Sequence, residues 1–119
     1  MPYAMEVQPA EGSEIRVLFD DGEYSVISGR YEEGDRRKLG ERWNGDTERP
    51  LGFPVSSGHP VWHVVPSFLE IPVLHGILDE LVRGSRQVGN ITVEAVVQEL
   101  RQFLAQDSRR RRSNTQIPR

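Results

Sequence analysis

The chain contains no cysteine, which excludes disulfide bonds and thiolate metal ligands. No apolar stretch approaches the roughly 18 residues that a membrane span needs, and the start of the chain lacks the basic and apolar regions of a signal peptide. A glycine-rich phosphate loop is also missing. We therefore expect a cytoplasmic protein without membrane contact, and we expect no cofactor.

Lysine is almost absent, because Lys38 is the only one among 15 lysines and arginines. Residues 1–106 hold 17 acidic and 10 basic residues, a net charge of −7, whereas residues 107–119 hold one acid and five arginines, a net charge of +4. Arginine forms planar, forked pairs with carboxylates or phosphates. The favoured interpretation is that the tail docks on an acidic protein surface across a subunit boundary, with nucleic-acid binding as the alternative. The arginines that carry it are Arg109, Arg110, Arg111 and Arg112.

A length of 119 residues predicts one domain over 1–119, with an irregular lead-in over 1–13 and the arginine-rich tail over 107–119. Only 36% of the residues are hydrophobic, so the core is thin. Burying a further face in a second copy would help stability, and we therefore expect a homo-oligomer.

Residues 14–28 predict a β-hairpin. Apolar Ile15, Val17 and Phe19 alternate with polar or smaller neighbours, as in a half-buried strand. Asp21-Gly22 is the pair that a two-residue type I′ turn prefers. That turn would place Phe19 opposite Tyr24 and Val17 opposite Val26.

Further strands are predicted at Leu39–Trp43 and Val61–Val65, with a turn in Glu33-Gly34-Asp35. Residues 46–60 are rich in proline and glycine and predict a long surface loop. Two helices follow over 71–82 and 93–104, with a capping box over Ser67–Glu70, a stop at Gly84 and a cap at Thr92. The predicted fold is α+β: an N-terminal antiparallel sheet of three to four strands followed by two amphipathic C-terminal helices.

One segment, Arg42 to His63, concentrates aromatic and polar side chains that are frequent in ligand pockets and at interface centres. As members of a sheet, its tryptophans are also natural core residues, so pocket, interface and core all remain open. The candidate binding residues are Arg42, Trp43, Asn44, Phe53, His59, Trp62 and His63.

His59 and His63 raise the question of a metal site. Extended chain separates residues four apart by about 13 Å, too far for two ligands of one ion. No histidine has a second ligand at helical spacing, so we predict no metal site, and no pattern of nucleophile and base assigns a catalytic residue.

The strings Leu39-Gly40-Glu41-Arg42-Trp43-Asn44-Gly45, Gly52-Phe53-Pro54, Gly58-His59-Pro60-Val61-Trp62 and Val64-Val65-Pro66 resemble short bacterial proteins of unknown function. Some of those proteins are carried on mobile integron gene cassettes. The resemblance covers residues 39–82 and brings no catalytic motif. It implies a bacterial, cytoplasmic origin and homo-oligomerisation.

These observations favour a small homo-oligomeric interaction or binding module over an enzyme. The first alternative is a small-molecule-binding protein or enzyme with a site around Arg42–His63. The second alternative is a nucleic-acid binder that uses Arg109–Arg112.

Overall fold

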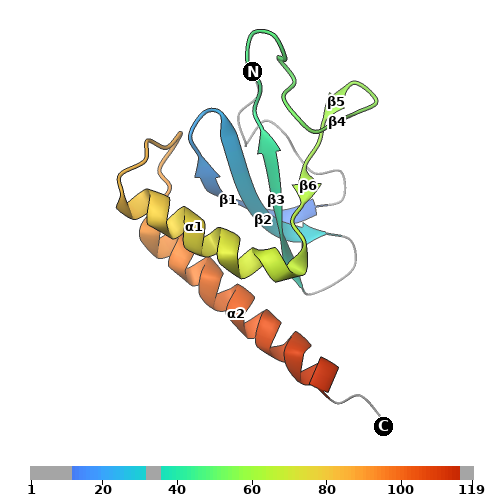
Figure 1. Cartoon of the computed structure of the whole chain (residues 1–119), viewed down its shortest axis with the longest axis vertical. Coiled ribbons are helices and arrows are strands. Elements are labelled where there is room, and N and C mark those ends of the chain that lie inside the picture. Colours follow the sequence, from blue (N-terminus) through green and yellow to red (C-terminus); the bar gives the residue numbers. More distant parts are fainter. Residues whose placement is uncertain (1–11, 32–35, 116–119) are drawn as a thin grey trace.

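The computed structural model describes residues 12–31 and 36–115. Four antiparallel strands form a sheet in the order β1-β2-β3-β6, and β4 and β5 form a separate hairpin. A short 3-10 helix, η2, precedes two α-helices that lie against one side of the sheet (Figure 1). The predicted α+β class, with a four-stranded sheet and a C-terminal helix pair, is confirmed. The bounds are β1 Gly12–Asp20, β2 Tyr24–Tyr31, β3 Arg37–Trp43, β4 Val55–Ser56, β5 His59–Pro60, β6 His63–Val64, η2 Ser67–Leu69, α1 Glu70–Val82 and α2 Val93–Thr115.

The main core lies between the sheet and the two helices. Val26 and Leu39 from the sheet are fully buried there against Leu74 of α1, and Val96 and Phe103 of α2. On the opposite side of the sheet, Ile27 and Trp62 form a smaller cluster with Ile15 and Val17. No helix in the described ranges is both long and apolar enough to cross a membrane.

The predicted hairpin exists, but its turn and register were wrong. Asp21 N–H bonds the Tyr24 carbonyl at 3.3 Å, which centres the turn on Gly22-Glu23 rather than on Asp21-Gly22. Gly22 has a φ of 94° while Glu23 has no positive φ, the pattern of a type II′ turn rather than type I′. The Asp21 carboxylate fixes this position by accepting bonds from the backbone N–H groups of Glu23 and Tyr24, both at 2.9 Å.

A β-bulge at Leu18 then changes the pairing. Val17 lies opposite Ile27 and Phe19 lies opposite Val26, so Leu18 is the extra residue of β1. Because of the bulge, the adjacent Leu18 and Phe19 both join the main core. Strict alternation could not predict this arrangement.

The helix ends follow the sequence in part. Thr92 caps α2, since its Oγ1 accepts a bond from Ala95 N–H at 3.2 Å, and Gly84 has a φ of 87° just beyond α1, as predicted. The capping box at Ser67–Glu70 was wrong. Ser67 Oγ and Glu70 Oε1 instead accept bonds from Arg36, each at 3.0 Å. Helix α2 also continues to Thr115, through the arginines of the predicted tail.

A buried ion pair attaches α2 to the sheet. Arg37 of β3 is fully buried and donates from Nε to Glu99 Oε1 at 2.9 Å. Ser28 Oγ of β2 bonds the same oxygen, and Arg16 of β1 donates to Glu99 Oε2 at 2.8 Å. Burial raises the pKa of Glu99, but these bonds and the charge of Arg37 outweigh it and lower that pKa overall. One carboxylate therefore joins three strands to one helix.

Candidate functional site

The structure divides the predicted binding residues between the two sides of β3. Successive side chains on a strand point to opposite faces. Trp43 lies on the helix side, whereas its neighbours Arg42 and Asn44 lie on the side that the loop 46–62 covers. Arg42, Asn44 and Trp62 are buried, and Trp43 and Phe53 are more than half exposed.

Arg42 holds the loop rather than a ligand. Its Nη1 donates to the Val61 carbonyl at 2.8 Å, and its Nη2 donates to the Leu51 carbonyl. The guanidinium carbon also lies 6.0 Å from the centre of the Trp62 ring. Burial lowers the pKa of Arg42, and no described carboxylate pairs with it. The arginine thus fixes residues 51 and 61, which lie on either side of Phe53 in the loop.

Asn44 has a comparable role at the start of the loop. Its Oδ1 accepts a bond from Ser25 Oγ at 2.6 Å, and its Nδ2 donates to Asp20 Oδ1 at 3.0 Å. The Asn44 N–H bonds the Glu23 carbonyl at 2.6 Å. Asn44 therefore joins the β1–β2 turn to the end of β3.

Trp43 and Phe53 are held together by their backbones. Trp43 N–H bonds the Phe53 carbonyl at 2.7 Å, and Phe53 N–H bonds the Trp43 carbonyl at 2.9 Å. The Trp43 ring also packs against Tyr24, with ring centroids 4.9 Å apart. Two strands and one loop thus present three aromatic rings at one edge of the molecule, with 55% of Trp43 and 63% of Phe53 exposed.

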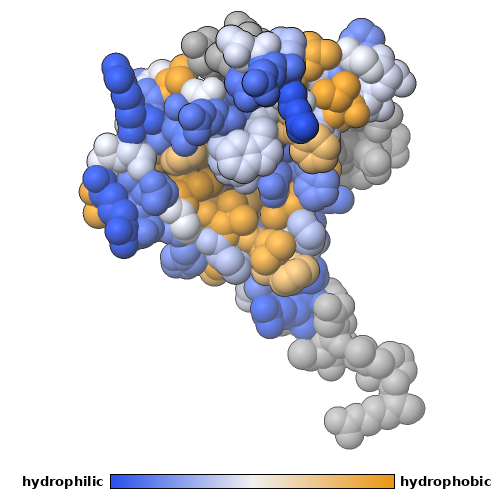
Figure 2. Space-filling view, turned by 45° about the horizontal axis from the view of Figure 1, so that its top comes forward, coloured by the Kyte–Doolittle hydropathy of each residue, from blue (hydrophilic) through white to orange (hydrophobic). Residues whose placement is uncertain are grey.

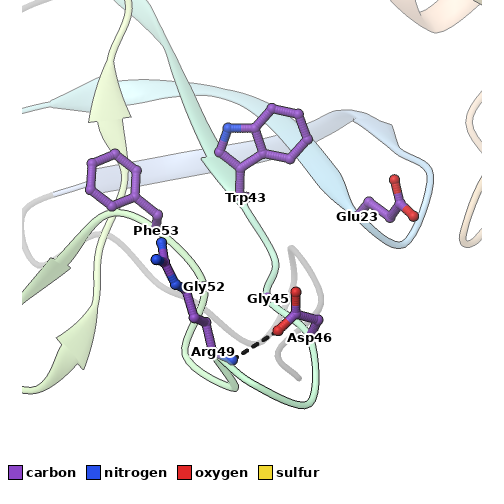
Figure 3. A pocket seen from close by; sticks show the side chains of 7 residues that line it. All are labelled: Glu23, Trp43, Gly45, Asp46, Arg49, Gly52 and Phe53. Atoms are coloured by element: carbon purple, nitrogen blue, oxygen red, sulfur yellow. Dashed lines mark hydrogen bonds between the residues drawn. The ribbon is translucent and has the colours of Figure 1, made fainter.

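Glycine allows the loop to approach this closely. Gly52 has a φ of 70°, and a Cβ there would lie 2.0 Å from the Trp43 carbonyl oxygen. The Asp46 carboxylate accepts bonds from the backbone N–H groups of Glu48 and Arg49 at 2.9 and 2.8 Å. The resulting turn directs the Arg49 side chain along the hollow toward Phe53 (Figure 3).

Two adjoining hollows share Trp43 and Glu23, and together we call them the Trp43 groove. The first, the loop hollow, has a volume of about 620 Å³ and is drawn in Figure 3. The second, the helix hollow, has a volume of about 680 Å³ and lies between the sheet and α1. The loop hollow is lined by Glu23, Trp43, Gly45, Asp46, Arg49, Gly52 and Phe53.

The helix hollow has an apolar floor and an acidic lining. Its floor is formed by Phe19, Tyr24, Val26, Val73 and Ile77, and its carboxylates are Asp21, Glu23, Glu41, Asp79 and Glu80. None of the described lysines or arginines lines it. Figure 2 shows hydrophobic surface near the centre of one face, bordered by hydrophilic residues.

The acidic environment also affects Tyr24. Burial and, after it, the adjacent Glu41 carboxylate together raise the pKa of Tyr24 to about 12. Asp79 is paired with Arg83 at 2.9 Å, whereas no described cation pairs with Glu23 or Glu41. The groove therefore retains free negative charge beside an exposed indole.

The two histidines of the segment lie outside this groove. His59 is on β5 and His63 is on β6, and both are exposed. Within the described ranges, no group of three histidine, cysteine or acidic residues could hold a metal ion.

The described arginines of the tail are helical and lie beyond the last buried residue of α2, Gln106. Arg110 and Arg111 both bond the Asp107 carboxylate, at 2.7 and 2.8 Å, and these bonds lower the pKa of Asp107. Arg109 is exposed. The side chain of Arg112 lies outside the described residues.

Sequence reasoning missed the carboxylates of the helix hollow, because they come from three separate segments. Only the register that places Tyr24 opposite Trp43 brings the β1–β2 turn beside the end of β3. The buried Glu99 could have been found, since it falls between Val96 and Phe103 on the apolar face of its helix.

Comparison with family models, with curated proteins and with solved structures finds no match.

Proposed function

We propose that this chain is a small interaction module that uses the Trp43 groove to bind a cationic, partly apolar segment of a protein. The observation that carries the proposal is the exposed Trp43, which lies between an apolar floor and the carboxylates of Glu23 and Glu41, with which no described cation pairs. Tryptophan is strongly enriched among the residues that dominate protein-binding energy. A large exposed aromatic that is held rigidly by both backbone and ring contacts is suited to that role.

The shape and charge of the groove support a protein segment as the ligand. An open hollow between a sheet edge and a helix resembles the apolar grooves that receive amphipathic helices. Carboxylates at its edge favour arginine or lysine on the ligand and repel phosphate. Nucleic acid is therefore a poor ligand for this face.

Calorimetric titration tests the proposal with a short helical peptide of leucine, alanine and arginine. We expect the protein to bind this peptide and Trp43→Ser to lose most of the affinity. Phe68→Ser is the matched control, because Phe68 is also an exposed aromatic, at 71%, and it lines neither hollow. Equal loss in both variants, or no binding by the parent chain, would refute the proposed function.

A further inference from the structure

The exposed side of α2 has the chemistry that the Trp43 groove requires. Helical residues three, four and seven apart share a face. The side of α2 that points away from the sheet carries exposed arginines around an exposed Leu104 and small residues. We call it the α2 outer face, and its members are Arg101, Leu104, Ala105, Ser108, Arg109 and Arg111.

Apart from Arg111, which bonds Asp107 on the same helix, no member of this outer face has a described ion-pair partner in its own chain. The residues of α2 that contact the body, such as Val96, Phe103 and Gln106, lie on the opposite side of the helix. No described carboxylate pairs with Arg101 or Arg109. Leu104 remains 46% exposed beside them. The α2 outer face is thus a cationic and partly apolar surface that remains exposed.

The groove and the outer face cannot meet within one molecule. Helix α2 begins next to the end of α1 and runs away from the β1–β2 turn, so its C-terminal part extends past the sheet (Figure 1). Residues 107–115 add about 13 Å of helix beyond Gln106. The C-terminal part of the α2 outer face therefore lies at the end of the molecule that is opposite the Trp43 groove.

We infer that the Trp43 groove binds the α2 outer face of a second copy of this chain. This inference rests on the proposed function and names its partner. Leu104 would contact the apolar floor beside Trp43, while Arg101 and Arg109 would lie near Glu23 and Glu80. Two copies related by a two-fold axis fill both grooves at once and leave neither surface unpaired.

Reversing charges on each surface tests the inference in the full-length protein. The groove variant carries Glu23→Arg and Glu80→Arg, and the helix variant carries Arg101→Glu and Arg109→Glu. We expect sedimentation equilibrium to give a dimer for the parent chain and a dissociation constant at least about tenfold higher for either variant. The combined variant, which carries all four substitutions, should recover the dimer, because the two surfaces again have opposite charges.

Lys38→Glu with Arg86→Glu is the matched control for the helix variant, since both residues are exposed and neither lines the groove or lies on α2. The dimer should tolerate this control and should weaken as salt rises. A monomeric parent chain overturns the inference, as does a dimer that both reversals leave intact or a combined variant that stays dissociated. A monomer that still binds the arginine peptide would retain the proposed function and identify a different cationic partner.

Discussion

Arg37 and Arg42 lie on the same strand and are both buried, yet their guanidinium groups have different partners. Arg37 faces the helices and meets the carboxylate of Glu99. Arg42 faces the loop and meets only backbone carbonyls. The difference indicates two functions for one strand: its helix side assembles the fold, and its loop side shapes the segment that completes the Trp43 groove.

The largest effect is expected from Arg37→Met. This substitution leaves the buried Glu99 carboxylate with the bond from Ser28 and with half-exposed Arg16 as its remaining described cation. Breaking a buried pair costs about 3–5 kcal/mol of unfolding free energy, which urea denaturation measures. Arg83→Met, which breaks the exposed pair with Asp79, should change that free energy by less than about 1 kcal/mol. Similar losses of unfolding free energy in the two variants would contradict the expected difference between buried and surface ion pairs.

Arg42→Met should have a smaller and more local effect. Two carbonyls of the loop lose their donor, but no buried charge is left without a partner. We expect a loss of about 1–3 kcal/mol and faster hydrogen exchange at the amides of Trp43 and Phe53. Hydrogen exchange at the amides of the two helices should accelerate no more than the loss of global stability requires. Exchange that accelerates equally in α2 would contradict a role confined to the loop.

The pH dependence of stability tests whether the charge of Glu99 stabilises the fold. Its pKa in the folded protein lies below the ordinary value of 4.5, so the stabilisation is present above pH 4.5. It is lost as the pH falls through the folded pKa. Glu99→Gln should therefore be less stable than the parent at neutral pH, and the difference should shrink in acid. A constant difference across the acid range would mean that the charge of Glu99 contributes nothing.

The smallest effect concerns Tyr24 at alkaline pH. Its phenol should ionise near pH 12, and Glu41→Gln should lower that pKa. Because the folded pKa is raised, the associated stability is present below pH 10 and declines as the pH rises toward 12. Difference ultraviolet titration of the parent against Tyr24→Phe isolates this group. If Glu41→Gln leaves the pKa of Tyr24 unchanged, the Glu41 carboxylate does not contribute to raising that pKa.

Much of the fold could be predicted because local signals carried it. Alternation in β1, the helical spacing of α1 and the Thr92 cap are properties of neighbouring residues. The Leu18 bulge could not be predicted, since only packing against the helices makes two adjacent buried side chains favourable. Ser67 and Glu70 matched a capping box, but Arg36 from the strand side binds both. Tertiary contacts override local preferences in each of these cases.

The sequence placed the seven candidate binding residues in one segment, and the structure assigns them different positions. Trp43 and Phe53 are brought together, while Arg42, Asn44 and Trp62 support the segment from within, and the histidines stand apart. Composition indicated that the segment was unusual, but it could not separate exposed from supporting residues. That separation depends on which side of β3 each residue occupies. It also depends on the loop, which Arg42 binds and which Gly52 allows to approach the backbone of Trp43.

The two tryptophans offer the most direct test of the Trp43 groove. Their indole N–H signals can be followed separately by heteronuclear NMR of dilute protein during titration with the leucine, alanine and arginine peptide. We expect the signal of exposed Trp43 to shift in step with the amides of Glu23 and Glu80, while that of buried Trp62 stays in place. A stationary Trp43 signal, or shifts centred on Trp62, would contradict the account.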